Sequence, residues 1–223
     1  LPSVSGTQPG GSRSPTTPSS QPHLTVDAVA SGNREAPMQT ATANVKYGGN
    51  TVQAHILLDG GSAKSYITVA LAEKLATHAE DKAVIRVSRF GSDDVEEIRT
   101  ATCKVQLHLR DNTWTELQVN VVPTITKTFK RKLVSNKHLV GLKLEDLADF
   151  TLVSEPTFEV ELLLGNDYYG RLFLSDKKYL GDGLYALKTQ LGWVLSGNLN
   201  SPSDDTDQFP SACAITFAEG GRA

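Results

Sequence analysis

The stretch Ile56-Leu57-Leu58-Asp59-Gly60-Gly61-Ser62-Ala63-Lys64-Ser65-Tyr66-Ile67-Thr68 is the most informative part of this 223-residue sequence. An apolar run ends in one carboxylate, two glycines and a serine, and the chain then becomes apolar again. A carboxylate at the inner end of an apolar strand is costly to bury unless it is paired or hydrogen-bonded. Two glycines let the backbone approach closely and adopt positive φ angles. Asp59 is therefore a candidate functional residue, although Asp-Gly between apolar runs is also the signal of a plain hairpin turn.

The segments around this stretch alternate between apolar and polar residues, which is the period of a β-strand. Residues 41–47 and 51–58 alternate on either side of Gly48-Gly49-Asn50, so we expect a hairpin whose second strand ends at Asp59. The same pattern predicts further strands at 83–90, 95–100, 101–109, 117–121, 158–164, 171–175, 184–187 and 193–195. Many short strands at close spacing predict an all-β fold, a barrel or a sandwich, with one or two short helices.

Two segments have helical patterns. Thr68 can cap a short helix in which Leu71 and Leu75 share the buried face. Leu144 and Leu147 share a face in a second predicted helix, within residues 139–150.

Composition divides the chain into three parts. Residues 1–35 are rich in Ser, Pro, Thr and Gly, and such a segment cannot bury enough apolar surface to offset its ordering entropy. We expect a disordered linker at 1–35, one folded domain at 36–200 and a flexible tail at 201–223. Because the chain lacks an initiator Met and a signal-peptide pattern, we expect it to be part of a longer polyprotein.

Charge and cysteine content exclude several function classes. The net charge of −3 gives no general attraction to nucleic acid or to a membrane surface, and no apolar run approaches the roughly 20 residues that span a bilayer. Cys103 and Cys213 form neither a zinc cluster nor a dense disulfide scaffold, which fits a reducing compartment. A basic cluster without an aromatic ladder is expected to be a solvated loop; its members are Lys127, Lys130, Arg131, Lys132 and Lys137.

The sequence lacks the motifs of other hydrolytic sites, so acid–base chemistry by carboxylates is the chemistry that remains. No Gly-x-Ser-x-Gly motif is present, and no two of the five histidines have metal-ligand spacing. Hydrolysis of a peptide by water needs one carboxylate as base and one carboxylic acid, and two carboxyls that share a proton do both tasks. No second Asp is followed by Gly-Gly, Ser-Gly or Thr-Gly. A catalytic Asp59 therefore requires Asp59 of a second copy, which a two-fold homodimer supplies.

Three motifs, in chain order, carry a family resemblance. The first combines Leu57-Leu58-Asp59-Gly60-Gly61-Ser62 with Ser65-Tyr66-Ile67-Thr68. The second, Leu162-Leu163-Leu164-Gly165-Asn166-Asp167-Tyr168-Tyr169, is an apolar strand that runs into Gly-x-Asp. The third is Thr189-Gln190-Leu191-Gly192-Trp193-Val194-Leu195-Ser196-Gly197. The ordered set resembles the retropepsins, the aspartic peptidases of retroviruses and retrotransposons, and above all the peptidase region of BEL/Pao-type retrotransposon polyproteins.

The resemblance implies a closed retropepsin-like β-barrel that works as a two-fold homodimer, with a flap hairpin over each site. The implied activity is that of an aspartic endopeptidase, a hydrolase that processes a retrotransposon polyprotein. Its partners would be a second copy of the chain and a peptide or polyprotein substrate, with no cofactor, no metal, no membrane and no nucleic acid for this domain. The implied location is cytoplasmic, or inside retroelement particles.

The resemblance also assigns site residues. Asp59 is the implied catalytic residue, and the active-site loop consists of Gly60, Gly61 and Ser62. The implied flap lies at Phe90, Gly91 and Ser92, and the structural motif contains Gly165 and Asp167.

Gly60 departs from the family pattern, which has Ser or Thr directly after the catalytic Asp. In the family this hydroxyl forms a hydrogen bond across the dimer axis. Its absence motivates a second hypothesis, a catalytically impaired or repurposed retropepsin domain that acts as a dimerising or peptide-binding module. A third hypothesis is a monomeric β-barrel binding module in which Asp59-Gly60 is only a turn.

Overall fold

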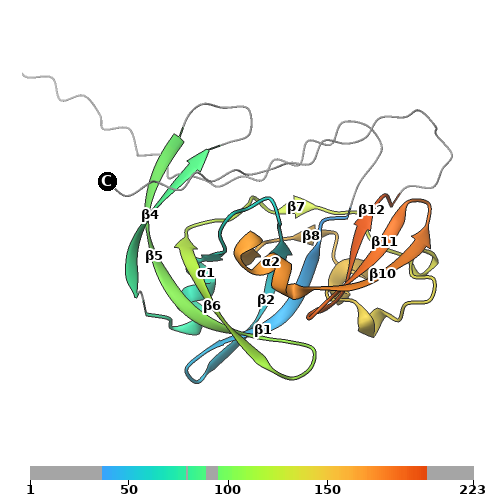
Figure 1. The fold of residues 1–223 in the computed structure, drawn as a ribbon, viewed down its shortest axis with the longest axis horizontal. Coiled ribbons are helices and arrows are strands. Elements are labelled where there is room, and N and C mark those ends of the chain that lie inside the picture. The colour runs from blue at the N-terminus through green and yellow to red at the C-terminus, as the bar shows by residue number, and fades with distance from the viewer. Residues whose placement is uncertain (1–36, 79, 89–94, 200–223) are drawn as a thin grey trace, which may run out of the picture.

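The computed structural model describes residues 37–199 of the chain, except residues 79 and 89–94 (Figure 1). The expected linker at 1–35 and the expected tail at 201–223 lie outside the described residues. In the described part, no helix has the length and apolar character needed to cross a membrane.

The described residues are predominantly β-structure, with two short α-helices and three 3₁₀-helices. In chain order the elements are β1 (Thr40–Tyr47), β2 (Asn50–Leu58), β3 (Tyr66–Thr68), α1 (Val69–Leu75), β4 (Asp81–Ser88), β5 (Val95–His108), β6 (Trp114–Val122), β7 (Phe129–Lys130), η1 (Asn136–His138), η2 (Leu144–Asp146), η3 (Phe150–Val153), β8 (Thr157–Phe158), β9 (Leu162–Leu164), α2 (Asn166–Leu172), β10 (Phe173–Gly181), β11 (Leu184–Thr189) and β12 (Gly192–Gly197).

Six strands close into a barrel (Figure 1). Their hydrogen bonding runs β1–β2–β9–β3–β6–β5 and returns from β5 to β1, where Val45 pairs with Leu107; β4 is added to β5 outside this ring. The interior is filled by apolar side chains such as Ile56, Leu117 and Leu162, each 0% exposed. The expected all-β class, with a closed barrel and two short helices, is therefore confirmed.

Local sequence signals produce the elements that lead to Asp59. β1 and β2 form the expected hairpin, with Val45 opposite Val52. Thr68 caps α1 as expected, because its side-chain oxygen accepts a hydrogen bond from the Leu71 amide at 3.2 Å. Leu71 and Leu75 are fully buried on one face of that helix.

The structure corrects two predicted elements. The strands expected at 95–100 and 101–109 form one continuous strand, β5, whose first half pairs with β4 and whose second half pairs with β6. The helix expected within 139–150 is wrong, since residues 136–153 contain only 3₁₀ turns. The backbone of Ala148 is bonded to other elements instead: its amide donates to the Trp193 carbonyl at 2.8 Å and its carbonyl accepts from the Thr42 amide at 2.8 Å.

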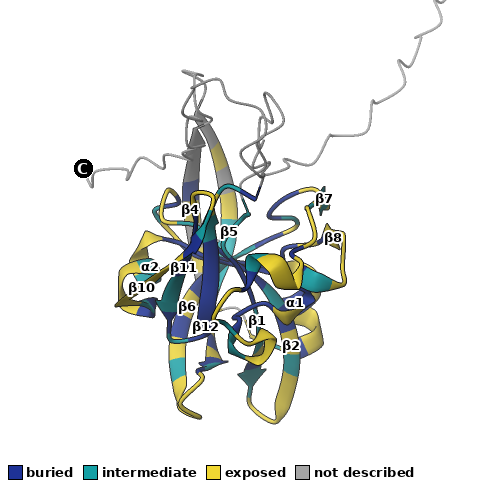
Figure 2. Ribbon diagram, turned by 90° about the vertical axis from the view of Figure 1, so that its right-hand side faces the viewer, coloured by how far each residue is buried: buried dark blue, intermediate teal, exposed yellow. Residues whose placement is uncertain are grey.

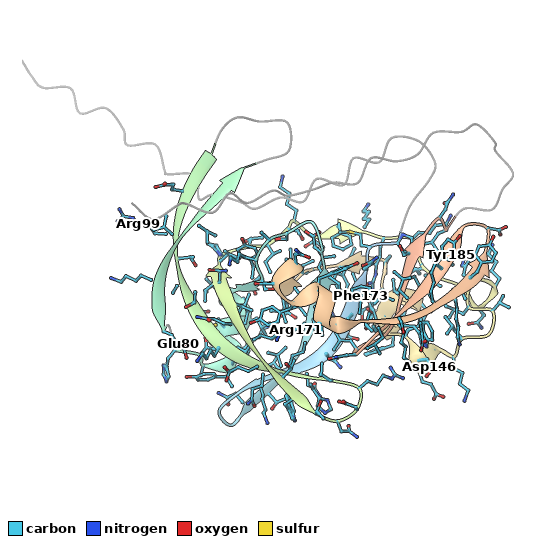
Figure 3. All side chains as sticks on the ribbon, in the orientation of Figure 1. Glu80, Arg99, Asp146, Arg171, Phe173 and Tyr185 are labelled. Atoms are coloured by element: carbon cyan, nitrogen blue, oxygen red, sulfur yellow. The ribbon has the colours of Figure 1, made fainter. Side chains whose placement is uncertain are left out.

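A second, three-stranded sheet follows α2, in the order β10–β11–β12. Figure 3 labels Tyr185 on β11 near one end of the molecule and Arg99 on β5 of the barrel near the other. β12 is largely buried, whereas β10, at the other edge of the same sheet, is largely exposed (Figure 2). Trp193 of β12 packs with Leu147 and Leu152 in a hydrophobic core that is separate from the core of the barrel.

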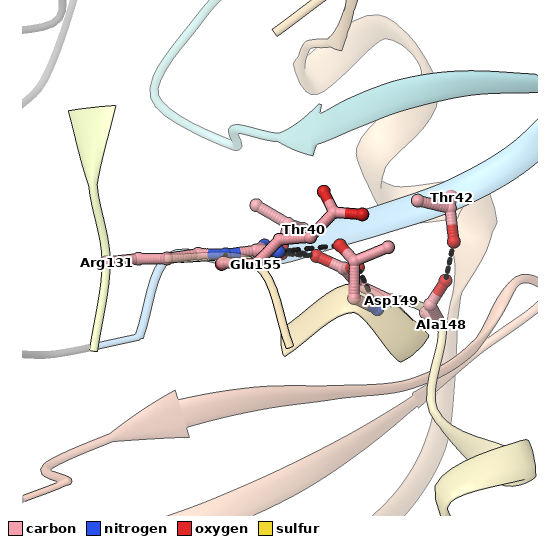
Figure 4. Close-up of polar contacts among 7 residues, drawn as sticks. Thr40, Thr42, Arg131, Ala148, Asp149 and Glu155 are labelled. Atoms are coloured by element: carbon pink, nitrogen blue, oxygen red, sulfur yellow. Dashed lines mark hydrogen bonds and ion pairs between the residues drawn. The ribbon is translucent and has the colours of Figure 1, made fainter. Parts of the chain in front are cut away.

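A buried ion pair lies within the 124–157 segment and is bonded to the barrel through Thr40 of β1 (Figure 4). The Arg131 guanidinium contacts the Asp149 carboxylate at 2.6 Å, and the two side chains are 7% and 0% exposed. Asp149 also accepts from the hydroxyls of Thr40 at 2.5 Å and of Thr151 at 2.6 Å. The expected solvated loop is therefore wrong for Arg131, whose guanidinium also lies over the Phe158 ring at 4.6 Å.

We expect Asp149→Ala to lower the free energy of unfolding by roughly 3–5 kcal/mol, because it leaves the Arg131 charge buried without its partner. Urea unfolding of the variant and of the unchanged chain measures this difference. The matched control is Glu145→Ala, which removes an ion pair whose members, Lys143 and Glu145, are 78% and 73% exposed. It should change stability by less than about 0.5 kcal/mol. Equal losses in the two variants would contradict a structural role for the buried pair.

Candidate active site

The loop that carries Asp59 begins where two parallel strands end. Leu58 of β2 pairs with Leu164 of β9, and the Asp59 amide donates to the Leu164 carbonyl at 3.0 Å. Leu58 and Leu164 are buried, whereas the Asp59 residue is half-buried. The parallel pair therefore fixes where the backbone of Asp59 emerges from the barrel.

Backbone groups of the loop orient the Asp59 carboxylate. The Gly61 amide donates to Asp59 Oδ1 at 2.9 Å, and the Ser62 amide donates to the Asp59 carbonyl at 3.2 Å. Ser62 is fully buried, and its hydroxyl donates to the Lys64 carbonyl at 3.1 Å. Gly60 and Gly61 are exposed, so the backbone of the loop faces solvent next to the Asp59 carboxylate.

Burial raises the pKa of Asp59 above its usual value of 3.8, and the hydrogen bond from the Gly61 amide, together with the nearby Ser62 amide, offsets part of this rise. A carboxyl with a raised pKa exchanges its proton nearer to neutral pH, which suits general acid–base chemistry.

The second sequence motif lies directly beside this loop. Asp167, in the first turn of α2, accepts from the Ser65 amide at 3.1 Å and from the Ser65 hydroxyl at 2.6 Å. The same hydroxyl accepts from the Gly165 amide at 2.9 Å. The Asn166 amide donates to the Ser62 carbonyl at 2.6 Å. Gly165 and Asp167, predicted as a structural motif, thus hold the far end of the Asp59 loop.

Gly165 is needed because the two backbones touch. A Cβ atom at this position would lie 2.7 Å from the Ser62 carbonyl oxygen and closer still to the Lys64 carbonyl oxygen. Real Cβ atoms do not approach backbone atoms to such distances, so any larger residue would separate α2 from the loop.

Sequence reasoning missed Tyr169 of α2. Its ring lies against Gly60, because a Cβ placed on Gly60 would be 3.4 Å from two of the ring carbons. Its hydroxyl donates to the Gln39 side-chain oxygen at 2.7 Å. Burial raises the pKa of the Tyr169 hydroxyl, and the nearby Asp59 carboxylate raises it further. The available signal was its position four residues after Gly165, which places it one helical turn along a helix that starts at the loop.

The structure also corrects one expectation about Gly60. Its φ angle lies outside the left-handed region that favours glycine. The absence of a side chain at position 60 therefore leaves space beside the Tyr169 ring, and it does not serve to allow a positive φ angle.

The predicted flap residues Phe90, Gly91 and Ser92 lie outside the described residues. The stem of the hairpin that carries them is described: β4 and β5 pair from Asp81 opposite Thr102 to Ser88 opposite Val95. Figure 1 shows this pair of strands extending beyond the barrel.

We expect the free energy of unfolding of Asp59→Asn to increase relative to that of the unchanged chain as pH rises. The folded state holds the Asp59 proton to higher pH than the unfolded chain, so ionisation of this group lowers stability as pH rises above 3.8. The penalty is absent below that pH and is removed at every pH in the Asn variant. Urea unfolding of both proteins across a pH series measures the difference, in which the other titrating groups cancel. A difference that does not vary with pH would contradict the raised pKa.

Comparison with known proteins identifies the family. The family model described as "Putative peptidase (DUF1758)" matches residues 41–204. No curated protein matches the chain. Among solved structures, the chain is similar to the crystal structure of the retroviral protease-like domain of Ddi1 from Leishmania major, at 12% sequence identity and a TM-score of 0.36, over 76% of this chain and 99% of that one. Because the family model matches most of this chain, the chain belongs to the DUF1758 peptidase family.

Proposed function

We propose that this chain is a retropepsin-like aspartic endopeptidase that acts as a two-fold homodimer on a retrotransposon polyprotein of the BEL/Pao type, with Asp59 as its catalytic residue. Membership of a peptidase family supports the reaction class. The observation that carries the proposal is the Asp59 carboxylate itself. It is half-buried at the end of two parallel strands, oriented by the Gly61 amide and raised in pKa.

The chemistry requires two carboxyls and each chain offers one. In the proposed dimer, the two Asp59 side chains share a proton across the axis, so that one is ionised and the other neutral. The ionised carboxylate takes a proton from water while the water oxygen attacks the peptide carbonyl carbon. The neutral carboxyl gives its proton to the carbonyl oxygen. The resulting diol then gives one hydroxyl proton to the Asp59 that is now ionised, the C–N bond breaks, and the other Asp59 passes the proton that it took from water to the leaving nitrogen.

The remaining parts of the proposed site bind the substrate. An extended peptide would bind along the exposed backbone of Gly60 and Gly61 by adding a strand. The β4–β5 hairpin would cover it as a flap and exclude water during the reaction. No metal or cofactor is part of this mechanism.

We expect Asp59→Asn to abolish peptide cleavage, because an amide can neither accept the proton of the attacking water nor share a proton with its twin. The assay follows peptide cleavage at mildly acidic pH, with and without a pepstatin-like inhibitor, and sedimentation of both proteins shows whether they still dimerise. An inactive variant with unchanged sedimentation supports the assignment. Full activity in the variant would refute it.

Gly60 favours a second candidate, a retropepsin domain that folds and dimerises but does not cut. The family hydroxyl is missing at this position, and a lost hydrogen bond of this kind costs on the order of 1 kcal/mol at each of two symmetric sites. The chain would then serve as a dimerising or peptide-binding module.

Gly60→Ser discriminates between the two candidates. The backbone at residue 60 accepts an L-residue, and the added Cβ makes an ordinary contact with the Tyr169 ring, so we expect the variant to fold. For an active peptidase we expect kcat/KM within a few-fold of the unchanged chain in the same cleavage assay. Activity that appears only in the serine variant would favour the non-cutting domain.

A further inference from the structure

Tyr169 is the side chain that contacts the Asp59 loop where the family has a hydroxyl. Its ring lies 3.4 Å from the position that a Cβ on Gly60 would take. Its own backbone belongs to α2, where its amide donates to the Gly165 carbonyl at 2.7 Å. The ring is therefore attached to the same helix end that holds the loop through Gly165.

Two further contacts fix the Tyr169 ring. Its hydroxyl donates to the side chain of Gln39 at 2.7 Å, and the Gln39 carbonyl accepts from the Leu58 amide at 2.8 Å. Leu58 immediately precedes Asp59. Tyr169 also stacks on Phe173, labelled in Figure 3, with ring centroids 4.1 Å apart. One side chain thus links the strand that enters the loop, the loop itself and the helix beside it.

We propose that Tyr169 is a positioning residue for Asp59, which restrains the Asp59-Gly60-Gly61 loop from within one subunit in place of the hydroxyl that position 60 lacks. This inference rests on the proposed function and deepens it. Two adjacent glycines make the loop backbone free to move, and a rigid ring with few rotatable bonds restrains it at low entropic cost.

The same contact limits which residues fit at position 60. A glycine is not required by the backbone at residue 60, since its φ angle is one that other residues adopt. A Cβ would fit against the ring, but each heavy atom beyond Cβ would have to turn away from it. The Tyr169 ring therefore leaves room for a Cβ atom at position 60 and restricts the direction of any larger side chain there.

The proposed position of the Tyr169 ring implies that it also limits the access of water to the Asp59 carboxylate. Asp59 influences the pKa of the Tyr169 hydroxyl, which places the two groups within electrostatic range, and burial is the main cause of the raised pKa of Asp59. Removing the ring should expose the carboxyl to water and lower its pKa, whereas removing only the hydroxyl should not.

The test compares Tyr169→Leu, Tyr169→Phe and the matched control Tyr168→Leu. Tyr168 is on the same helix, but its hydroxyl accepts from the Gln118 amide and its ring lies under the Arg171 guanidinium. Two readouts are taken on the folded, full-length chain: the titration of the Asp59 carboxyl by ¹³C NMR, assigned with Asp59→Asn, and kcat and KM for peptide cleavage across a pH series.

We expect Tyr169→Leu to lower the pKa of Asp59, to move the acid limb of the kcat/KM profile to lower pH, and to reduce kcat by about tenfold to 100-fold with KM changed far less. Tyr169→Phe should keep the titration and most of kcat, and Tyr168→Leu should keep both. If Tyr169→Leu does not fold, Tyr169→Met tests the same contact, because it keeps an apolar side chain of similar length but removes the ring, and it should also lower the pKa of Asp59.

The outcomes separate this inference from the proposed function. One outcome is that the unchanged chain does not cut peptides, while the Asp59 titration shifts in Tyr169→Leu but not in Tyr169→Phe. This outcome would reject the peptidase function and retain the positioning role. An active peptidase whose titration and kcat are the same in Tyr169→Leu overturns the positioning role alone. Equal shifts in Tyr168→Leu and Tyr169→Leu also overturn it, since the effect would then be one of general packing.

Discussion

The contact between Gly165 and the backbone of the Asp59 loop is the constraint on which the arrangement of this site depends. At this point the end of β9 and the start of α2 touch the carbonyls of Ser62 and Lys64 so closely that no side chain fits between them. The hydrogen bond from the Asp59 amide to Leu164 closes the near end of the loop, and the bonds of Asp167 to Ser65 close the far end. Two segments about 100 residues apart in the chain therefore act as one rigid unit that carries the carboxylate.

The electrostatics of the site follow from this arrangement. Asp59 is withdrawn from water far enough for burial to dominate its pKa, but it keeps amide donors that limit the rise. A carboxyl with a raised pKa holds its proton to higher pH than a fully solvated aspartate does, which suits proton transfer. Tyr169 contributes from the helix side, where its ring lies beside Gly60 and its hydroxyl donates to Gln39. In the proposed dimer, each chain would supply one of the two carboxyls.

The second sheet and the 124–157 segment are joined to the barrel by polar contacts as well as by apolar packing. Asp149 is fully buried, and its oxygens accept from Arg131, Thr40 and Thr151, so the cost of burying its charge is offset by well-formed bonds. Because Thr40 is the first residue of β1, this cluster connects the irregular segment to the strand that closes the barrel. The Ala148 backbone adds a bridge between β1 and β12.

Local pattern was sufficient for the features that depend on neighbours in the chain. Alternation predicted the β1–β2 hairpin, and the capping signal at Thr68 predicted α1. The closed barrel was predicted as a class, from many short strands and from the family resemblance.

Features that depend on distant partners were not readable from the sequence. The absence of a helix at 139–150 follows from bonds of Ala148 to Thr42 and Trp193, and the burial of Arg131 follows from Asp149 and Phe158. The role of Gly60 becomes visible only with the Tyr169 ring beside it, 109 positions later in the chain. Periodicity and capping report the energy of a residue with its near neighbours, whereas burial, ion pairing and the space around a side chain are set by residues that only the folded chain brings together.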